Sequence, residues 1–99
     1  MDLESVAKVF KALCDEKRLN IIQQLISGEK CACMLLDDLN FTQSGLSYQM
    51  KILTESGLVN GREDGKWVYY SINDEGCMNA IKLLLEVTNT SDKIKVAKE

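Results

Sequence analysis

The residues with the most distinctive chemistry are four cysteines, two of which stand two positions apart at Cys31 and Cys33. Thiolates are preferred ligands of soft metal and metalloid ions, and a helix N-terminus favours the thiolate because its partial positive charge stabilises the anion. Free cysteine is also among the most buried residue types, so packed thiols without a ligand stay open as a reading. The chain has no histidine. This excludes metal sites built on imidazole and removes catalysis by Ser-His or Cys-His pairs.

The spacing of this cysteine pair sets a geometric condition on ion binding. On a regular α-helix, positions i and i+2 point about 200° apart. Both thiolates therefore chelate one ion only if the first helical turn is distorted or if Cys31 lies just before the helix. Ion binding is then expected to bend that turn and to move the helix that follows it.

A second distinctive segment is a helix that the sequence predicts after Thr42, which offers an N-capping hydroxyl. Its apolar positions Leu46, Met50 and Leu53 recur at helical spacing. A helix that reads the major groove needs one packed face and one face of short or amide side chains. The polar face here can contact base edges and phosphates through Gln43, Ser44, Ser47, Tyr48, Gln49 and Lys51. From this helix alone, a merely solvated polar face stays open.

Beyond residue 58 the apolar period changes to that of strands. Residues 59–62 and 66–72 are predicted to form a hairpin around a tight turn at Asp64-Gly65. Arg62 and Lys66 flank this turn, where a wing would meet the phosphate backbone or minor groove, although the acidic residues of the tip oppose that contact. The hairpin strengthens the DNA-binding interpretation of the helix before it.

Further helices must position these two segments. Apolar residues at helical spacing predict helices over residues 3–13, from Asp15 to about Ser27-Gly28, and around residues 31–38. Asp74 is expected to cap a last helix, and residues 91–99 form a charged tail that is expected to fray. The order of four helices, hairpin and helix predicts one mostly α domain over residues 1–99 with a β-hairpin wing, which is a winged helix-turn-helix.

Length and composition limit the number of domains, the assembly and the location of the protein. A chain of 99 residues, 45% hydrophobic and 27% charged, has the size of one domain. The first and last helices carry more apolar surface than so small a domain covers, which favours a homodimer. An acidic start and the lack of a long apolar run predict a cytoplasmic protein with no membrane contact, whose cysteines stay reduced. The net charge of −3 permits DNA binding without indicating it.

Four segments, at residues 10–19, 42–53, 56–59 and 65–71, resemble the ArsR/SmtB family of metal-sensing repressors. The resemblance spans residues 5–75. It implies winged-helix homodimers, built through the first and last helices, that bind imperfectly palindromic operator DNA and release it when a metal ion binds. Two departures concern the DNA-reading helix. Many members have proline where Ser44 or Gly45 stands and histidine where Tyr48 and Gln49 stand, so the base preference is expected to differ.

The run Lys30-Cys31-Ala32-Cys33 is similar to the Cys-x-Cys of the family's arsenic and cadmium/lead sensors. This implies that Cys31 and Cys33 bind As(III) or Sb(III) as inducer, with Cd(II) or Pb(II) as the alternative. Arsenite prefers three thiolates, and Leu36 and Thr54 occupy the places of the usual third cysteine. The third ligand is then Cys14, Cys77 or a small thiol such as glutathione.

Two further alternatives stay open at this point. The first is a repressor that responds to oxidation by forming a disulfide among these cysteines. The second is a winged-helix module that binds another protein and has no affinity for DNA.

Overall fold

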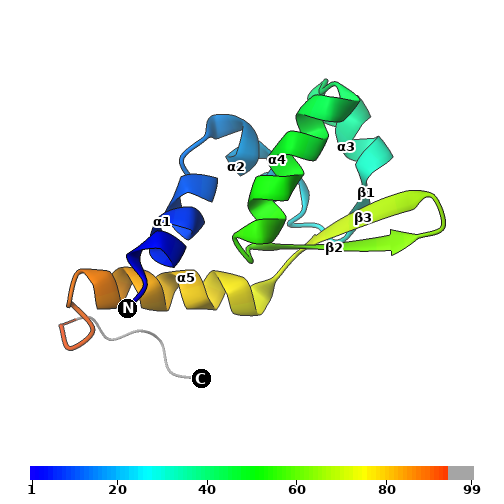
Figure 1. The fold of residues 1–99 in the computed structure, drawn as a ribbon. Helices are drawn as coiled ribbons and strands as arrows, with labels where there is room; N and C mark the ends of the chain where they lie inside the picture. Colours follow the sequence, from blue (N-terminus) through cyan, green and yellow to red (C-terminus); the bar gives the residue numbers. More distant parts are fainter. Residues whose placement is uncertain (94–99) are drawn as a thin grey trace.

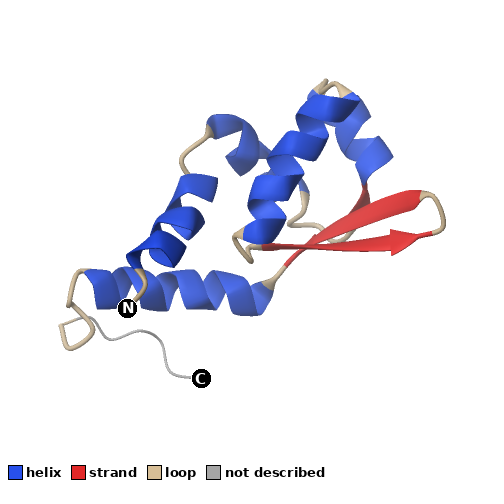
Figure 2. Ribbon diagram, in the orientation of Figure 1, coloured by secondary structure: helices blue, strands red, loops and turns tan. Residues whose placement is uncertain are grey.

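In the computed structural model, helices make up most of the chain, and a small antiparallel sheet projects from them (Figures 1 and 2). The structure describes residues 1–93, so most of the tail expected over residues 91–99 lies outside the described residues. The elements are α1 (Leu3–Ala12), α2 (Glu16–Gln24), β1 (Lys30–Cys31), α3 (Ala32–Leu39), α4 (Gln43–Glu55), β2 (Val59–Asp64), β3 (Trp67–Ile72) and α5 (Asp74–Val87). The predicted winged helix-turn-helix is confirmed, with one additional strand.

Side-chain caps determine where the helices begin. As predicted, Asp15 and Thr42 cap α2 and α4, and the Thr42 hydroxyl accepts the Gly45 backbone N–H at 3.0 Å. The prediction for α5 is wrong by one residue, because its cap is Asn73, whose side chain accepts the Gly76 N–H at 3.0 Å. Asp74 is instead the first helical residue, where its negative charge complements the helix dipole.

The strand β1 was not expected from the sequence. It pairs with β3, so the sheet has the order β1-β3-β2. In this register Cys31 lies opposite Tyr69 on one side of β3, and Arg62 lies opposite Tyr69 on the other. A strand of two residues is too short to show an alternating pattern. Its consequence is that the first residue of the cysteine pair belongs to the wing sheet as well as to the start of α3.

The core lies between α2, α3 and α4, and the apolar positions predicted for α4 are buried there. The largest fully buried side chains are Ile21, Leu25, Leu35, Met50 and Leu53. Each core side chain of this size contributes about 1.5–3 kcal/mol through burial, so the core holds α4 against its neighbours.

α1 and α5 contribute Val9, Ala12 and Ala80 to the core, and they lie side by side at the end of the molecule away from the hairpin turn (Figure 1). The outer side of α5 leaves large apolar residues exposed, namely Met78, Ile81, Leu84 and Val87. Among the described residues, every helix is too short or too polar to span a bilayer.

Candidate nucleic-acid interface and thiol site

The exposed side of α4 carries most of the polar residues that the sequence singled out. Gln43, Ser44, Ser47, Tyr48 and Lys51 are exposed, and the Tyr48 ring has 61% of its surface accessible. The backbone N–H groups at the start of α4 add partial positive charge on the same side. This surface has the short, amide and aromatic groups that base edges and phosphates accept.

Gly45, unlike its exposed neighbours on α4, lies against the residue that caps the helix. A Cβ atom at this position would come within 2.9 Å of the Thr42 hydroxyl oxygen, which caps the helix. The small residue therefore leaves room for the capping hydrogen bond.

Gln49 does not lie on the exposed face, so the prediction that it joins Tyr48 there is wrong. Its side chain is only 8% exposed, and its amide oxygen accepts a hydrogen bond from Arg18 Nη1 at 2.7 Å. At about 100° per residue, position 49 falls close to the packed positions Leu46 and Leu53. A buried amide at this place requires a polar partner, and Arg18 provides it.

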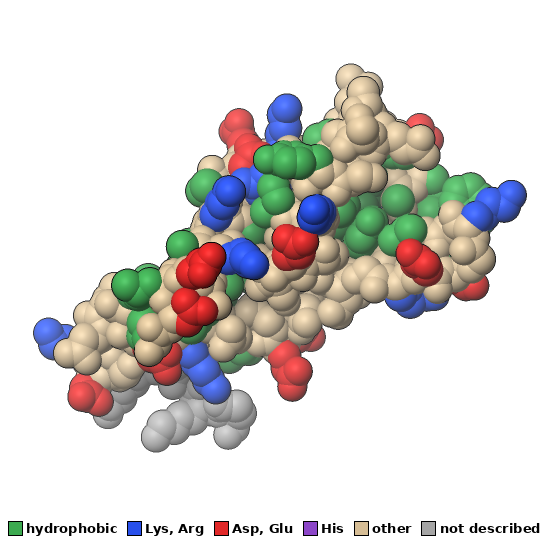
Figure 3. Space-filling view, in the orientation of Figure 1, with side chains coloured by type: hydrophobic (Ala, Val, Ile, Leu, Met, Phe, Trp, Pro, Cys, Tyr) green, Lys and Arg blue, Asp and Glu red, His purple; other side chains and the backbone are tan. Residues whose placement is uncertain are grey.

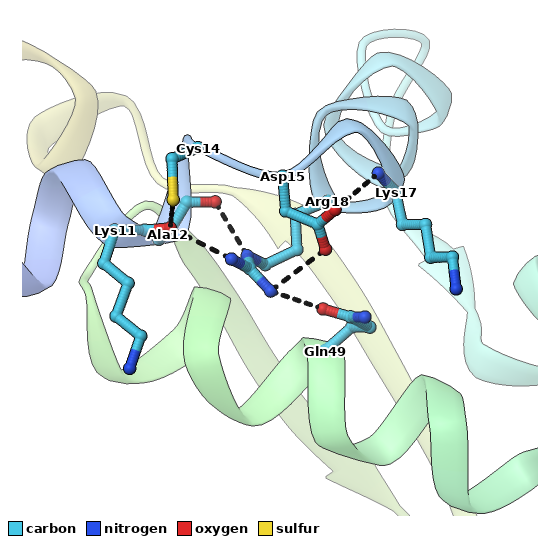
Figure 4. A network of polar contacts seen from close by, with 7 residues as sticks. All are labelled: Lys11, Ala12, Cys14, Asp15, Lys17, Arg18 and Gln49. Carbon is cyan, nitrogen blue, oxygen red and sulfur yellow. Dashed lines mark hydrogen bonds and ion pairs between the residues drawn. The ribbon is translucent and has the colours of Figure 1, made fainter.

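Arg18 is a buried residue for which no role was predicted from the sequence. The residue is 6% exposed, and its guanidinium donates to the carbonyl oxygens of Lys11 and Ala12, both at 3.0 Å. It also forms an ion pair with Asp15 at 3.2 Å. Figure 4 shows how this one side chain joins the end of α1, the start of α2 and the body of α4. The sequence carries one signal for this role. Arg18 stands three residues after the capping Asp15, among the apolar residues of the same helix.

On the wing, Arg62 is not free to contact phosphate. Its Nε and Nη2 atoms each donate to a carboxylate oxygen of Glu29 at 2.8 Å, and its guanidinium lies 4.6 Å from the centre of the Tyr69 ring. Hydrogen bonds from Arg62 lower the pKa of Glu29, which keeps the pair charged. Lys66, at the turn between β2 and β3, is exposed and makes no ion pair with any residue from 1 to 93.

The cysteine pair meets the geometric condition stated above. Cys31 has extended backbone angles (φ −70°, ψ 144°) and is the N-cap of α3, so it lies just before the helix. The two sulfur atoms are 2.7 Å apart, and the Cys33 backbone N–H also points to the Cys31 sulfur at 3.4 Å. Hydrogen bonds from the thiol and then the backbone of Cys33 lower the pKa of Cys31. Holding this shared proton raises the pKa of Cys33.

The other two cysteines lie in separate surroundings. Cys14 is exposed after α1, and its thiol donates to the Lys11 carbonyl at 3.1 Å. Cys77 is half-buried on α5 with its sulfur 4.0 Å from the Leu58 carbonyl, and burial raises its pKa. Among residues 1–93, no three His, Cys, Asp or Glu side chains come together as a metal site. The described chain thus offers a pair of thiols and brings neither Cys14 nor Cys77 to it.

A cavity of about 200 Å³ separates the start of α3 from α4 and the wing. We call it the wing cavity; its lining includes Cys33, Leu36, Gln43, Ser47, Lys66 and Trp67. Figure 3 shows hydrophobic side chains gathered between the lobe formed by α3 and α4 and the hairpin. Cys33 and the exposed side of α4 therefore border the same hollow.

A helix-turn-helix made by α3 and α4, followed by a β-hairpin wing, defines a winged-helix DNA-binding regulator. Residues 15–61 match the family described as "Bacterial regulatory protein, arsR family". The chain is 43% identical over 74 residues to the arsenical resistance operon repressor of Bacillus subtilis (strain 168), covering 74% of this chain and 70% of that protein. The chain belongs to the arsR family and is a transcriptional repressor, not an enzyme.

Two further comparisons bear on ligand and assembly. A cadmium resistance transcriptional regulatory protein, a CadC homolog of Staphylococcus aureus, is 39% identical over 71% of this chain and 59% of its own length. The solution structure of a homodimeric winged helix-turn-helix DNA-binding domain from Mycobacterium bovis, a possible ArsR-family regulator, has a TM-score of 0.71. It is 27% identical, with 98% of this chain and 90% of that chain covered. Two of these relatives are thus named for resistance to arsenicals and to cadmium.

Proposed function

We propose that this repressor binds operator DNA as a homodimer and releases it when As(III), or its analogue Sb(III), is captured by Cys31 and Cys33. The observation that carries the proposal is the 2.7 Å separation of the two sulfurs at the junction of β1 and α3. Two bonds to one soft ion require these sulfurs to move apart, and Cys31 can move because it lies just before the first turn of α3. The name of the Bacillus relative, an arsenical resistance repressor, supports arsenic as the element.

For DNA binding, we assign contacts to the exposed residues of α4 and to the wing turn. Gln43, Ser47 and Tyr48 read base edges, while Ser44, Lys51 and Lys66 contact phosphates. Gln49 acts indirectly, because its bond to Arg18 holds α4 in place. Gly45 keeps the helix cap intact. Arg62 contributes only when Glu29 releases it, which reduces the electrostatic share of the affinity.

The route from ion to DNA follows from the place of Cys31. This residue caps α3 and also pairs with Tyr69 of β3, whose other neighbour is Arg62. A bound ion supplies covalent bonds to both sulfurs. Both thiols lose their protons on binding, so the Cys33 thiol no longer donates to the Cys31 sulfur. The two sulfurs then move apart, and the first turn of α3 shifts together with the wing sheet. A change from mostly bound to mostly free operator needs roughly 10⁴-fold preference for the free form, about 5.5 kcal/mol.

The homodimer is supported by the apolar surface of α5 beside α1. A groove with an almost wholly apolar lining runs between these helices and includes Phe10, Leu13, Ile81 and Leu84. A two-fold dimer presents two copies of α4 to half-sites about one helical turn apart, which explains why a palindromic operator suits it.

The test is fluorescence anisotropy with labelled DNA from upstream of the repressor's own gene, at a stated salt concentration. Arsenite should dissociate the wild-type complex. Cys31→Ser and Cys33→Ser should bind DNA but fail to respond, and serine preserves the N-cap of α3. The matched controls Cys14→Ser and Cys77→Ser should respond as wild type. Release by arsenite from a Cys31/Cys33 double variant would show that the site is placed wrongly.

Cadmium or lead is the second candidate, favoured by the identity to the CadC homolog. Thiolate-bound Cd(II), Pb(II) and As(III) give different ultraviolet charge-transfer bands, so titration of the reduced protein separates them. A loss of free thiols without such bands would instead support regulation by oxidation.

A further inference from the structure

We propose that the third bond of the captured metalloid goes to a small carboxylate-bearing thiol from solution, which occupies the wing cavity. This inference rests on the proposed function and specifies the ligand set of the same site. It starts from the number of thiols. Among residues 1–93 the pair has no third protein ligand beside it, whereas As(III) takes three thiolates.

The two remaining cysteines are badly placed to supply that ligand. Cys14 follows α1 and bonds to the Lys11 carbonyl, and Cys77 packs beside Leu58. In the dimer proposed through α1 and α5, the partner chain would meet these two helices, which lie away from the hairpin turn that carries Lys66 (Figure 1). The third sulfur must then come from solution.

The wing cavity has the size and lining for such a molecule. Cys33 is the exposed member of the pair and borders the cavity of about 200 Å³. Leu36 and Trp67 offer an apolar wall for a methylene chain. Lys66, which makes no ion pair within residues 1–93, offers a cation for a carboxylate.

The chemistry balances without an oxidant. Arsenous acid carries three hydroxyl groups. Each of three thiols, two from the protein and one from solution, loses its proton to a departing hydroxyl. Three As–S bonds form, three As–O bonds break and three water molecules leave. Arsenic stays trivalent throughout.

The place of this co-ligand has a direct effect on DNA binding. Gln43, Ser47 and Lys66 line the cavity and are also proposed DNA contacts. A carboxylate held there occupies Lys66 and adds negative charge where a phosphate would lie. The captured thiol therefore opposes DNA through charge as well as through the shift of α3.

The experiment uses the full chain, reduced with a thiol-free phosphine and loaded with arsenite, with or without glutathione. Native mass spectrometry should find one arsenic and one glutathione per protomer. X-ray absorption should find three sulfur neighbours with glutathione, and two sulfurs and one oxygen without it. Two sulfurs and one oxygen in both samples would overturn the inference. So would three sulfurs without glutathione that fall to two in a Cys14→Ser/Cys77→Ser variant.

A second measurement tests the place of the co-ligand. In competition between glutathione and uncharged 2-mercaptoethanol, Lys66→Gln should lower the preference for glutathione by about two- to fivefold, the range of an exposed ion pair. Lys82→Gln on α5 is the matched control and should keep the preference. If Lys66→Gln keeps the wild-type preference for glutathione, the proposal that the co-ligand binds in the wing cavity is overturned. If a Cys31→Ser/Cys33→Ser variant binds arsenic like wild type, the proposed function itself fails, which is a distinct result.

Discussion

Tyr48 and Gln49 are neighbours in sequence with opposite environments. Tyr48 is exposed on α4, whereas Gln49 is buried and bonded to Arg18. Hydrophobic spacing predicted the packed positions of α4 correctly because it depends only on helical geometry. Position 49 falls on the same packed side, but an amide favours exposure unless it has a buried partner, and the partner of Gln49 comes from another helix, α2.

Tyr48→Ala should reduce the preference for operator over unrelated DNA and leave the stability of the protein unchanged. One base contact contributes about 1–3 kcal/mol to discrimination. Anisotropy titrations against both DNAs, with urea unfolding in parallel, check this. Equal discrimination by the variant and the wild type would remove Tyr48 from the reading face.

Gln49→Ala should lower the free energy of unfolding by about 1–3 kcal/mol, because the Arg18 guanidinium loses a buried acceptor. Its DNA affinity should fall alike for operator and unrelated DNA, since α4 loses a positioning contact. Urea unfolding measures the first effect. Gln43→Ala, on the exposed start of the same helix, is the control and should unfold like wild type; a stable Gln49→Ala would contradict the positioning role.

Among the helices and strands, features that depend on contacts within one helical turn could be predicted from the sequence. Features that depend on pairing between distant residues could not. The caps Asp15 and Thr42 were predictable because each bonds within its own helix turn. The strand β1 was not, since two residues form it only by pairing with β3. The Glu29–Arg62 ion pair also joins residues far apart in the sequence and could not be predicted. The sequence therefore predicts the same DNA contact for Arg62 as for Lys66.

Glu29→Gln should strengthen DNA binding, because it weakens the ionic contact that holds Arg62. With one more phosphate contact, the slope of log K against log salt should steepen by about one. Binding isotherms over a salt series measure it. Glu55→Gln, on α4 but outside any ion pair among residues 1–93, controls for the change in net charge. Equal slopes in both variants would show that Arg62 stays away from DNA.

The whole molecule is elongated, with principal extents of 45 × 28 × 23 Å. The hairpin turn and the paired helices α1 and α5 lie toward opposite ends (Figure 1). The surplus of apolar residues on the first and last helices could be predicted from the sequence, because helical spacing alone shows it. The interface that covers them depends on a second chain and stays a prediction.

Ile81→Glu/Leu84→Glu should give a folded monomer, because both side chains are about half exposed on α5 and would bring charges into the apolar groove. Sedimentation at micromolar concentration should show a dimer for wild type and for the control Lys82→Gln. The monomer should bind full operator much more weakly, since it engages one half-site. A monomeric wild type at this concentration contradicts the proposed assembly.

Trp67 is the single tryptophan of the chain and borders the wing cavity with half of its surface exposed. Its indole emission therefore originates at the point where ion, co-ligand and DNA would meet, with no other indole to obscure it. A heavy atom on Cys33 should quench that emission, and a docked duplex should shift its wavelength. The protein thus carries a built-in optical reporter, which allows the order of ion capture and DNA departure to be timed by stopped flow without a label.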